Sequence, residues 1–236
     1  MLQLVLIPGL ACDAAMWQAQ QAAMPAHWVV SVTDVHARHD TLEAMAGTLL
    51  AEHAGELVLC GASMGGMLAM EVARQAPQRI RGLALLSTSA RPEDAATRAL
   101  REAAIVLFEQ GRVAEVLQAN LPLAFDASRA ADTELHQTYL DMIGRAGAAQ
   151  LVAQNRAVIA RPDALAHIGR LRCPVLVLCG ENDQLTPPER SRELAAAIPG
   201  AELALLSRCG HMLTMEQPEA VNARLLKWLG RIAPGT

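Results

Sequence analysis

The chain has 236 residues, of which 52% are hydrophobic and 19% are charged, so it holds enough apolar material for a buried core and is not a disordered chain. Its formal net charge is -4 and no run of Lys or Arg stands out, which argues against nucleic acid or an anionic membrane as the main partner. The five cysteines are odd in number and include no C-x-x-C pair, so we expect no disulfide framework and no metal site.

The sequence holds no apolar stretch near the ~20 residues that a bilayer-spanning helix needs. The apolar run over residues 2–10 is short for an export signal, and no Lys or Arg precedes it. We therefore expect a cytoplasmic protein without a membrane partner. The oligomeric state stays open.

Short apolar runs alternate with helical patterns over most of the chain. The apolar runs predict strands at residues 2–7, 27–35, 57–60, 80–87, 174–179 and 201–206. The run at 27–35 is more polar, so we expect it nearer the edge of the sheet. Apolar periodicity predicts helices at residues 40–55, 64–75, 187–198 and 218–229. A capping box with Asp40 as N-cap and Glu43 at the third helical position opens the first of these helices.

Residues 91–168 break this alternation, because their apolar residues recur only at three- and four-residue spacing. That spacing predicts helices throughout the segment. We expect an α/β fold with a mostly parallel, doubly wound sheet in three layers, built from residues 1–90 and 169–236. Residues 91–168 would form a small helical lid inserted in this core.

The motif Gly61-Ala62-Ser63-Met64-Gly65 stands between a predicted strand and a predicted helix. The two glycines remove side chains that would clash in so sharp a turn, which projects the serine hydroxyl out of the fold. The helix that follows aims free backbone N–H groups at the same place. A hydroxyl in that setting is suited to be the nucleophile of an acyl transfer.

Two further candidates follow later strands, and the carboxyl ends of parallel strands meet at one edge of a sheet. Asp183 follows the strand at 174–179, and His211 follows the strand at 201–206. Histidine is the usual base for a serine hydroxyl, and a buried carboxylate fixes its tautomer. The order Ser63, Asp183, His211 is a known order of nucleophile, acid and base.

Other polar residues have weaker claims to a role. Glu181 rivals Asp183 as the acid, but Asp183 stands closer to the predicted helix that follows. His36 and His39 lie in the polar loop 34–40 and could suggest a metal, but we expect them to be solvated. Arg38 in the same loop could meet a substrate carboxylate, and we expect a surface position instead.

Three segments together carry a family resemblance. GASMGG, GENDQLTPP and GHMLTMEQPEAVN resemble the nucleophile, acid and histidine segments of the α/β-hydrolase superfamily. The resemblance covers nearly the whole chain and implies an α/β-hydrolase fold in which Ser63, Asp183 and His211 form a catalytic triad. It also implies an oxyanion hole made by the backbone N–H groups of Leu10 and Met64. Pro8-Gly9 stands where the family usually has His-Gly.

Within that superfamily, SMGGM, TPP and HMLTMEQP resemble small carboxylesterases and 3-oxoadipate enol-lactonases. The resemblance implies hydrolysis of an ester or lactone without a cofactor. Our leading hypothesis is a serine hydrolase that cleaves a small, largely apolar ester, thioester or lactone through an acyl-serine intermediate. The chain's only Phe and Tyr residues all lie in the expected lid. One or more of these aromatic residues could line an acyl pocket with a nearby methionine: Phe108, Phe125, Tyr139 and Met212.

Two alternatives stay open. The same fold supports a lyase or a C–C bond hydrolase in which His211 is the general base and Ser63 is not acylated. The second alternative is a non-catalytic receptor that binds a ligand in the same pocket. Covalent labelling of Ser63 and turnover of esters distinguish these alternatives from a serine hydrolase.

Overall fold

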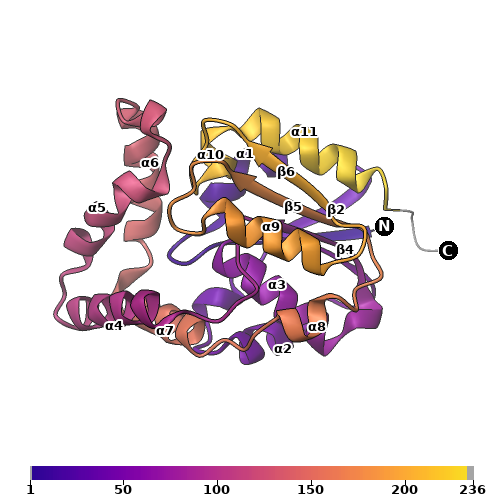
Figure 1. The fold of residues 1–236 in the computed structure, drawn as a ribbon, viewed down its shortest axis with the longest axis horizontal. Helices are drawn as coiled ribbons and strands as arrows, with labels where there is room; N and C mark the ends of the chain where they lie inside the picture. Colours follow the sequence, from indigo (N-terminus) through magenta and orange to yellow (C-terminus); the bar gives the residue numbers. More distant parts are fainter. Residues whose placement is uncertain (1, 233–236) are drawn as a thin grey trace.

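A sheet of parallel strands runs through the centre of the molecule (Figure 1). The computed structural model describes residues 2–232. Within them the sheet has six strands: β1 Leu2–Ile7, β2 Trp28–Val32, β3 Leu57–Ala62, β4 Ile80–Leu86, β5 Val175–Gly180 and β6 Glu202–Leu206. Their spatial order is β2-β1-β3-β4-β5-β6, and every neighbouring pair is parallel. β2 therefore lies at an edge, as its polar sequence predicts.

Helices cover both faces of the sheet because side chains alternate between the faces along each strand. Leu4 and Leu6 of β1 belong to one hydrophobic cluster, and Val5 and Ile7 belong to the other. The first face packs against α11 (Pro218–Leu229), and α1 (Gln18–Ala23) lies against α11 on the same side. The second packs against α2 (Leu42–Glu52), α3 (Met64–Gln75), α8 (Leu165–Ile168) and α9 (Pro188–Ala197). The predicted three-layer α/β fold is confirmed.

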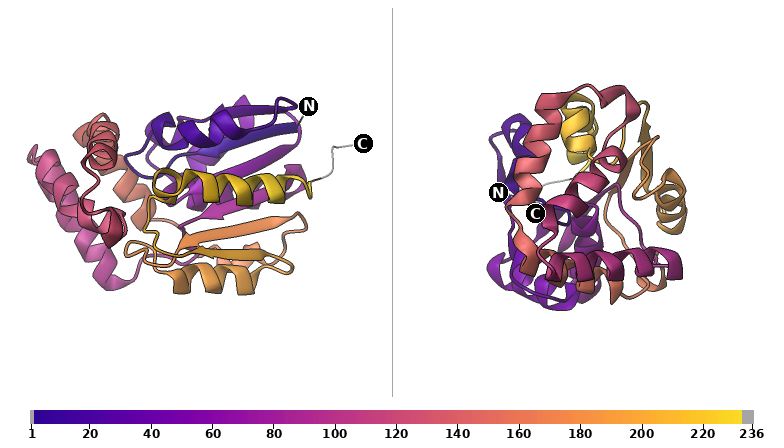
Figure 2. Two further views of the ribbon diagram at one scale, coloured as in Figure 1. Left: turned by 90° about the horizontal axis from the view of Figure 1, so that it is seen from above. Right: turned by 90° about the vertical axis from the view of Figure 1, so that its left-hand side faces the viewer.

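Four further helices lie beyond the carboxyl ends of the strands (Figure 1). They are α4 Ala95–Glu109, α5 Val113–Ala124, α6 Thr133–Gly144 and α7 Gly147–Ile159. The left view of Figure 2 shows the same separation, with these magenta to salmon helices set apart from the rest of the fold. Most of their buried residues join the hydrophobic cluster on the α11 face of the sheet, and Ala157 and Val158 of α7 join the cluster on the α2 and α3 face. The wholly helical character predicted for this segment is confirmed.

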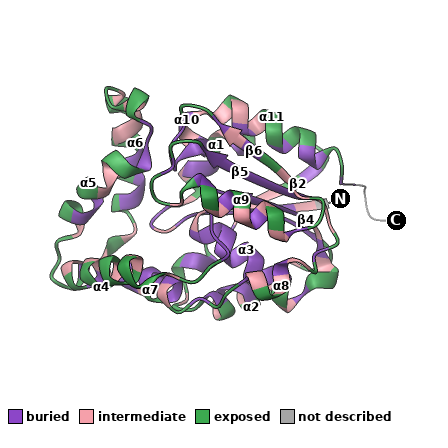
Figure 3. Cartoon of the chain, viewed as in Figure 1, coloured by how far each residue is buried: buried purple, intermediate pink, exposed green. Residues whose placement is uncertain are grey.

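Short helices complete the connections between these elements. They are α10 Leu213–Glu216 and the 3-10 turns η1 Ala14–Trp17, η2 Val35–Ala37, η3 Pro77–Arg79 and η4 Ala127–Arg129. Figure 3 shows buried residues concentrated in the strands and on the inner helix faces, with exposed residues along the outer faces. All six residues of β3 and of β5 are buried. Across residues 2–232, no helix is both long enough and apolar enough to cross a bilayer.

The structure corrects three local expectations. The N-cap of α2 is Thr41, not Asp40, because the extended backbone of Thr41 lets its hydroxyl accept the Ala44 N–H at 3.2 Å. β2 ends at Val32, before a 3-10 turn. The helix α1 was not predicted, since its Gln and Ala residues carry no large apolar side chain at helical spacing.

Candidate active site

Ser63 occupies the sharp turn between β3 and α3. Its backbone has φ 53° and ψ -119°, the left-handed region that most side chains avoid. The turn presses against β1, because a Cβ added to Gly65 would lie 2.1 Å from the Ile7 carbonyl oxygen. Only glycine fits that contact. Ser63 is half-buried between the buried residues Ala62 and Met64, so its hydroxyl stands at the carboxyl end of β3.

The backbone N–H groups around Ser63 divide into paired and free donors. The Ser63 N–H donates to the Leu86 carbonyl at 2.8 Å, and the N–H groups of Gly66 and Met67 donate to the Ser63 carbonyl at 3.0 and 3.2 Å. The Met64 N–H has no acceptor among residues 2–232. It is one of the orphan donors at the start of α3, where the helix dipole favours negative charge.

The loop after β1 lies against this turn. A Cβ added to Gly9 would lie 3.4 Å from Ser63 Cβ, which is ordinary contact distance. The other backbone donors of the loop are paired: Gly9 with Met16 Sδ at 3.4 Å, Ala11 with Gln154 Oε1 at 2.9 Å, and Cys12 with the Gly9 carbonyl at 3.1 Å. The Leu10 N–H alone among residues 9–12 has no acceptor in the described chain. The loop that carries the free Leu10 N–H therefore lies against the turn that carries Ser63 and the free Met64 N–H.

Asp183 and His211 meet across the loops after β5 and β6. His211 Nδ1 lies 2.9 and 3.0 Å from the two oxygens of Asp183, whose side chain is fully buried. An ionised carboxylate only accepts hydrogen bonds, so Nδ1 donates to Asp183, and Nε2 is the ring nitrogen that Asp183 leaves unpaired. Within residues 2–232, neither His211 Nε2 nor the Ser63 hydroxyl has a hydrogen-bond partner.

The surroundings of Asp183 keep it ionised. Burial by itself raises the pKa of the Asp183 carboxyl, but the charge and hydrogen bond of His211 and the backbone N–H of Thr186 outweigh burial. The pKa therefore lies below its ordinary value. The Thr186 hydroxyl and the Leu185 N–H donate two further bonds, at 2.9 and 3.0 Å.

Comparison with known proteins places the chain in a family. A family model described as serine aminopeptidase, S33 (Hydrolase_4) matches residues 23–218. The chain belongs to this family, within the α/β-hydrolase superfamily. A pimeloyl-[acyl-carrier protein] methyl ester esterase from Aromatoleum aromaticum is 30% identical over 234 residues, which cover 92% of this chain and 93% of that protein.

Two solved structures share the fold along nearly the whole chain. A thermophilic esterase from Thermogutta terrifontis, with malate bound, has a TM-score of 0.90 and 29% identity, and the match covers 99% of this chain and 91% of that one. The enol-lactonase from Burkholderia xenovorans LB400 has a TM-score of 0.88 and 25% identity, with 98% and 92% covered. These relatives support an enzyme of the hydrolase kind that acts on small molecules.

In this α/β-hydrolase, Glu216 links the loop that carries His211 to the end of α5, a role for which its own sequence segment gives no signal. Glu216 is buried, and its two oxygens accept the N–H groups of Gly210 and Asp126, both at 2.8 Å. Burial, together with the nearby charge of Asp126, raises the pKa of Glu216 above its ordinary value. The Met212 N–H donates to the Ala124 carbonyl at 3.0 Å. His211 therefore stands on a loop fixed from both sides.

The residues expected around an acyl pocket are all buried in one hydrophobic cluster: Phe108, Phe125, Tyr139 and Met212. Phe125 and Tyr139 pack edge to face, with ring centroids 5.1 Å apart. Met212 directly follows His211, and its backbone bond to Ala124 brings it to the segment that carries Phe125. The structure thus brings Phe125 and Tyr139 close to the segment that carries His211 and Met212, and places Phe108 in the same hydrophobic cluster.

The weaker candidates lie elsewhere. Glu181 is exposed, and Asp183 rather than Glu181 meets the histidine. Arg38 is on the surface and forms ion pairs with Asp34 and Glu52.

The expectation that both loop histidines are solvated is wrong for His36, which is 2% exposed. Its Nε2 lies 2.8 Å from the Cys12 carbonyl, beneath the loop after β1. His39 instead pairs with the Thr48 hydroxyl. No group of three potential ligands in the described chain could hold a metal.

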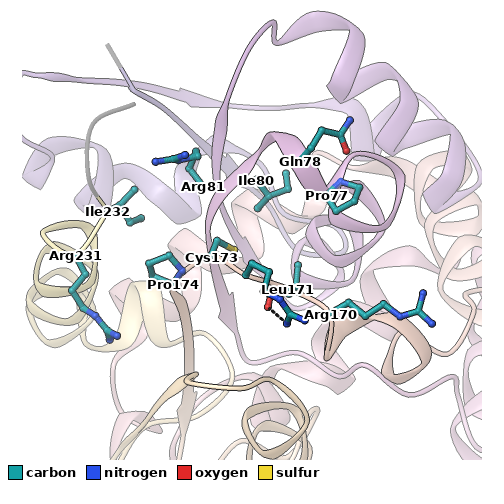
Figure 4. Close-up of a pocket in the computed structure, with 11 residues that line it drawn as sticks. Pro77, Gln78, Ile80, Arg81, Arg170, Leu171, Cys173, Pro174, Arg231 and Ile232 are labelled. Carbon is teal, nitrogen blue, oxygen red and sulfur yellow. Dashed lines mark hydrogen bonds between the residues drawn. The ribbon is translucent and has the colours of Figure 1, made fainter. Parts of the chain in front are cut away.

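A hollow of about 580 Å³ lies at the opposite end of the sheet (Figure 4). Ile80, the first residue of β4, and Pro174, just before β5, line it, so it opens at the amino ends of these strands. Two of its arginines are already paired, Arg81 with Glu56 and Arg231 with Glu202. The hollow is therefore separate from the edge that carries Ser63.

The ionised state of Asp183 predicts how stability changes with pH. Its pKa is lower in the folded chain than the ordinary value of 3.8, so the folded state binds fewer protons there than the unfolded state. This contribution to stability is present above about pH 4 and is lost as the pH falls through the lowered pKa. We expect Asp183→Asn to melt at a lower temperature than the wild type at neutral pH, and the difference to narrow on acidification. Thermal melts of both proteins from neutral pH to below about pH 4 measure this difference in melting temperature. A difference that stays constant with pH would contradict the pairing of Asp183 with His211.

Proposed function

We propose that this hydrolase cleaves a small, largely apolar ester, thioester or lactone through an acyl-Ser63 intermediate. One observation carries the proposal: four unpaired groups suited to acyl transfer gather at the carboxyl edge of the sheet. They are the Ser63 hydroxyl, His211 Nε2, and the N–H groups of Leu10 and Met64. A nucleophile, a base oriented by a carboxylate and two donors for an oxyanion are the parts that acyl transfer requires.

Acylation begins when His211 Nε2 takes the proton of the Ser63 hydroxyl. Ser63 Oγ attacks the carbonyl carbon, and the carbonyl oxygen becomes an oxyanion that accepts bonds from the Leu10 and Met64 N–H groups. Asp183 stabilises the imidazolium through Nδ1. The intermediate collapses, the bond to the leaving oxygen or sulfur breaks, and His211 returns the proton to the leaving group.

Deacylation repeats these steps with water as the nucleophile. His211 Nε2 takes a proton from the water, whose oxygen attacks the acyl carbon. The Ser63 ester bond then breaks, Ser63 regains the proton from His211, and the carboxylic acid leaves. These steps use only groups of this chain and water.

Residues 91–168, in this proposal, act as a lid on a core formed by residues 1–90 and 169–236. The position of α4–α7 beyond the carboxyl ends of the strands supports that role (Figure 1). Phe108, Phe125, Tyr139 and Met212 would shape an apolar acyl pocket, and their burial in one cluster is consistent with this. The methyl ester esterase and enol-lactonase among the relatives support a carboxylic ester or lactone as the substrate class. We also propose a cytoplasmic location, which the five free thiols favour.

A substrate panel tests this function. Wild-type protein is assayed with p-nitrophenyl esters from acetate to a long-chain acid, with aliphatic lactones and with thioesters. We expect turnover of one or more of these classes, falling as the acyl chain outgrows the pocket. Cleavage of a C–C bond with no ester turnover would favour the lyase or C–C hydrolase alternative, and tight binding without turnover would favour a receptor.

A further inference from the structure

Gln154, on α7, reaches from the helical segment into the loop that follows β1. Its side chain is 0% exposed, and both of its polar atoms are used. Oε1 accepts the Ala11 N–H at 2.9 Å, and Nε2 donates to the His36 carbonyl at 3.0 Å. Because both polar groups of this buried amide are hydrogen-bonded to the backbone of distant residues, Gln154 links α7 rigidly to the loop after β1 and to the His36 segment.

The loop that Gln154 holds is a tight turn in an unfavourable conformation. The Cys12 N–H donates to the Gly9 carbonyl at 3.1 Å, which closes a four-residue turn over residues 9–12. Ala11, the third residue of the turn, has φ 63°. Turns with a positive φ at this position favour glycine, and an alanine there needs support from its surroundings. Gln154 gives that support by accepting the Ala11 N–H.

The same turn sets the direction of the Leu10 N–H. The Leu10 N–H belongs to the same planar peptide unit as the Gly9 carbonyl, which the Cys12 N–H holds. His36 supports the far side of the turn, with Nε2 2.8 Å from the Cys12 carbonyl. If Ala11 left its left-handed conformation, the turn would open and the direction of the Leu10 N–H would change.

We propose that Gln154 is a positioning residue for the oxyanion hole, acting through Ala11 on the Leu10 N–H. This inference rests on the proposed function, in which that N–H binds the oxyanion. It makes one part of the helical segment a support of the loop that carries Leu10.

Two substitutions on α7 form a matched test. Gln154→Leu removes the acceptor of the Ala11 N–H. Asn155→Leu is the control, because Asn155 is also a buried amide but bonds only to the Leu151 carbonyl at 2.8 Å and to Arg101 at 3.1 Å. We expect Gln154→Leu to lower kcat by about 10- to 100-fold with KM nearly unchanged, since a misplaced oxyanion donor weakens binding of the transition state and not of the substrate. Asn155→Leu should keep kcat within about twofold, because its bonds do not touch the loop.

A third variant separates positioning from stability. Gln154→Glu keeps an oxygen to accept the Ala11 N–H, but it replaces the donor to His36 with a second oxygen that faces the His36 carbonyl, and it buries a charge. We expect its kcat to exceed that of Gln154→Leu even where its melting temperature is lower. A merely structural role would instead make kcat follow the melting temperature across the three variants.

A second measurement is the rate at which a fluorophosphonate inactivates each variant, expressed per folded molecule. This rate depends on how well the oxyanion hole stabilises the attack of Ser63. Equal losses in Gln154→Leu and Asn155→Leu, or a kcat order that follows stability, would overturn the positioning role. If the wild type neither reacts with the phosphonate nor turns over any ester, the proposed function fails and this inference fails with it. If the wild type reacts and the variants do not differ, only this inference fails.

Discussion

Ser63→Ala is expected to lower kcat by about 10⁶-fold, the size of loss seen when a serine hydrolase of known mechanism loses its nucleophile. Without Oγ no acyl-enzyme forms, and the remaining donors, the N–H groups of Leu10 and Met64, can act only on a direct attack by water. The melting temperature should change little, because the Ser63 hydroxyl has no hydrogen-bond partner among residues 2–232. Ester hydrolysis and thermal melts of the purified variant measure the two effects.

Ser89→Ala is the matched control for that experiment. Ser89 also follows a strand carboxyl end, that of β4, and among residues 2–232 its hydroxyl accepts the Arg91 N–H at 3.2 Å and has no hydrogen bond to Ser63 or His211. Its kcat should stay within about twofold of the wild type. A Ser63→Ala protein that kept a substantial part of the wild-type rate would show that Ser63 is not acylated.

Asp183→Asn is expected to lower kcat by about 10⁴-fold with a small change in KM. The amide in this variant does not stabilise the imidazolium and does not keep the proton on His211 Nδ1. His211 Nε2 is therefore a poorer base for the Ser63 hydroxyl. Glu181→Gln is the control on the same loop, because Glu181 is exposed and does not meet the histidine. Steady-state kinetics of both variants measure the effect. A larger loss in Glu181→Gln than in Asp183→Asn would assign the orienting role to the other acid.

The sheet and the candidate site residues could be identified from the sequence because their signals are local. Uniformly apolar runs mark strands buried on both faces, and β3 and β5 are indeed buried along their whole length. Ser63 and Asp183 come shortly after such strands, and His211 comes after β6, which is only partly buried, so parallel pairing brings all three to one edge. The structure shows the pairing of Asp183 with His211 that this placement predicts.

The supports of the site could not be predicted, because they depend on packing between distant segments. Gln154 meets Ala11 from 143 positions away, and Glu216 meets Asp126 from 90 positions away. Neither contact produces a recognisable pattern in the sequence around the residues that make it. His36 shows the same limit: a histidine in a polar loop is usually solvated, but here the loop after β1 covers it. Local composition indicates which residues can react, and the tertiary packing decides which residues hold them.

The most direct test of the central claim is covalent labelling with a fluorophosphonate followed by peptide mass spectrometry. We expect one adduct per active chain, on the peptide that contains Ser63, and loss of ester turnover in proportion to the labelling. His211→Ala should label far more slowly, since the base that activates Ser63 is missing. Ester turnover that persists in fully labelled protein, or an adduct on another residue that accounts for the loss of activity, would contradict the assignment of Ser63 as the nucleophile.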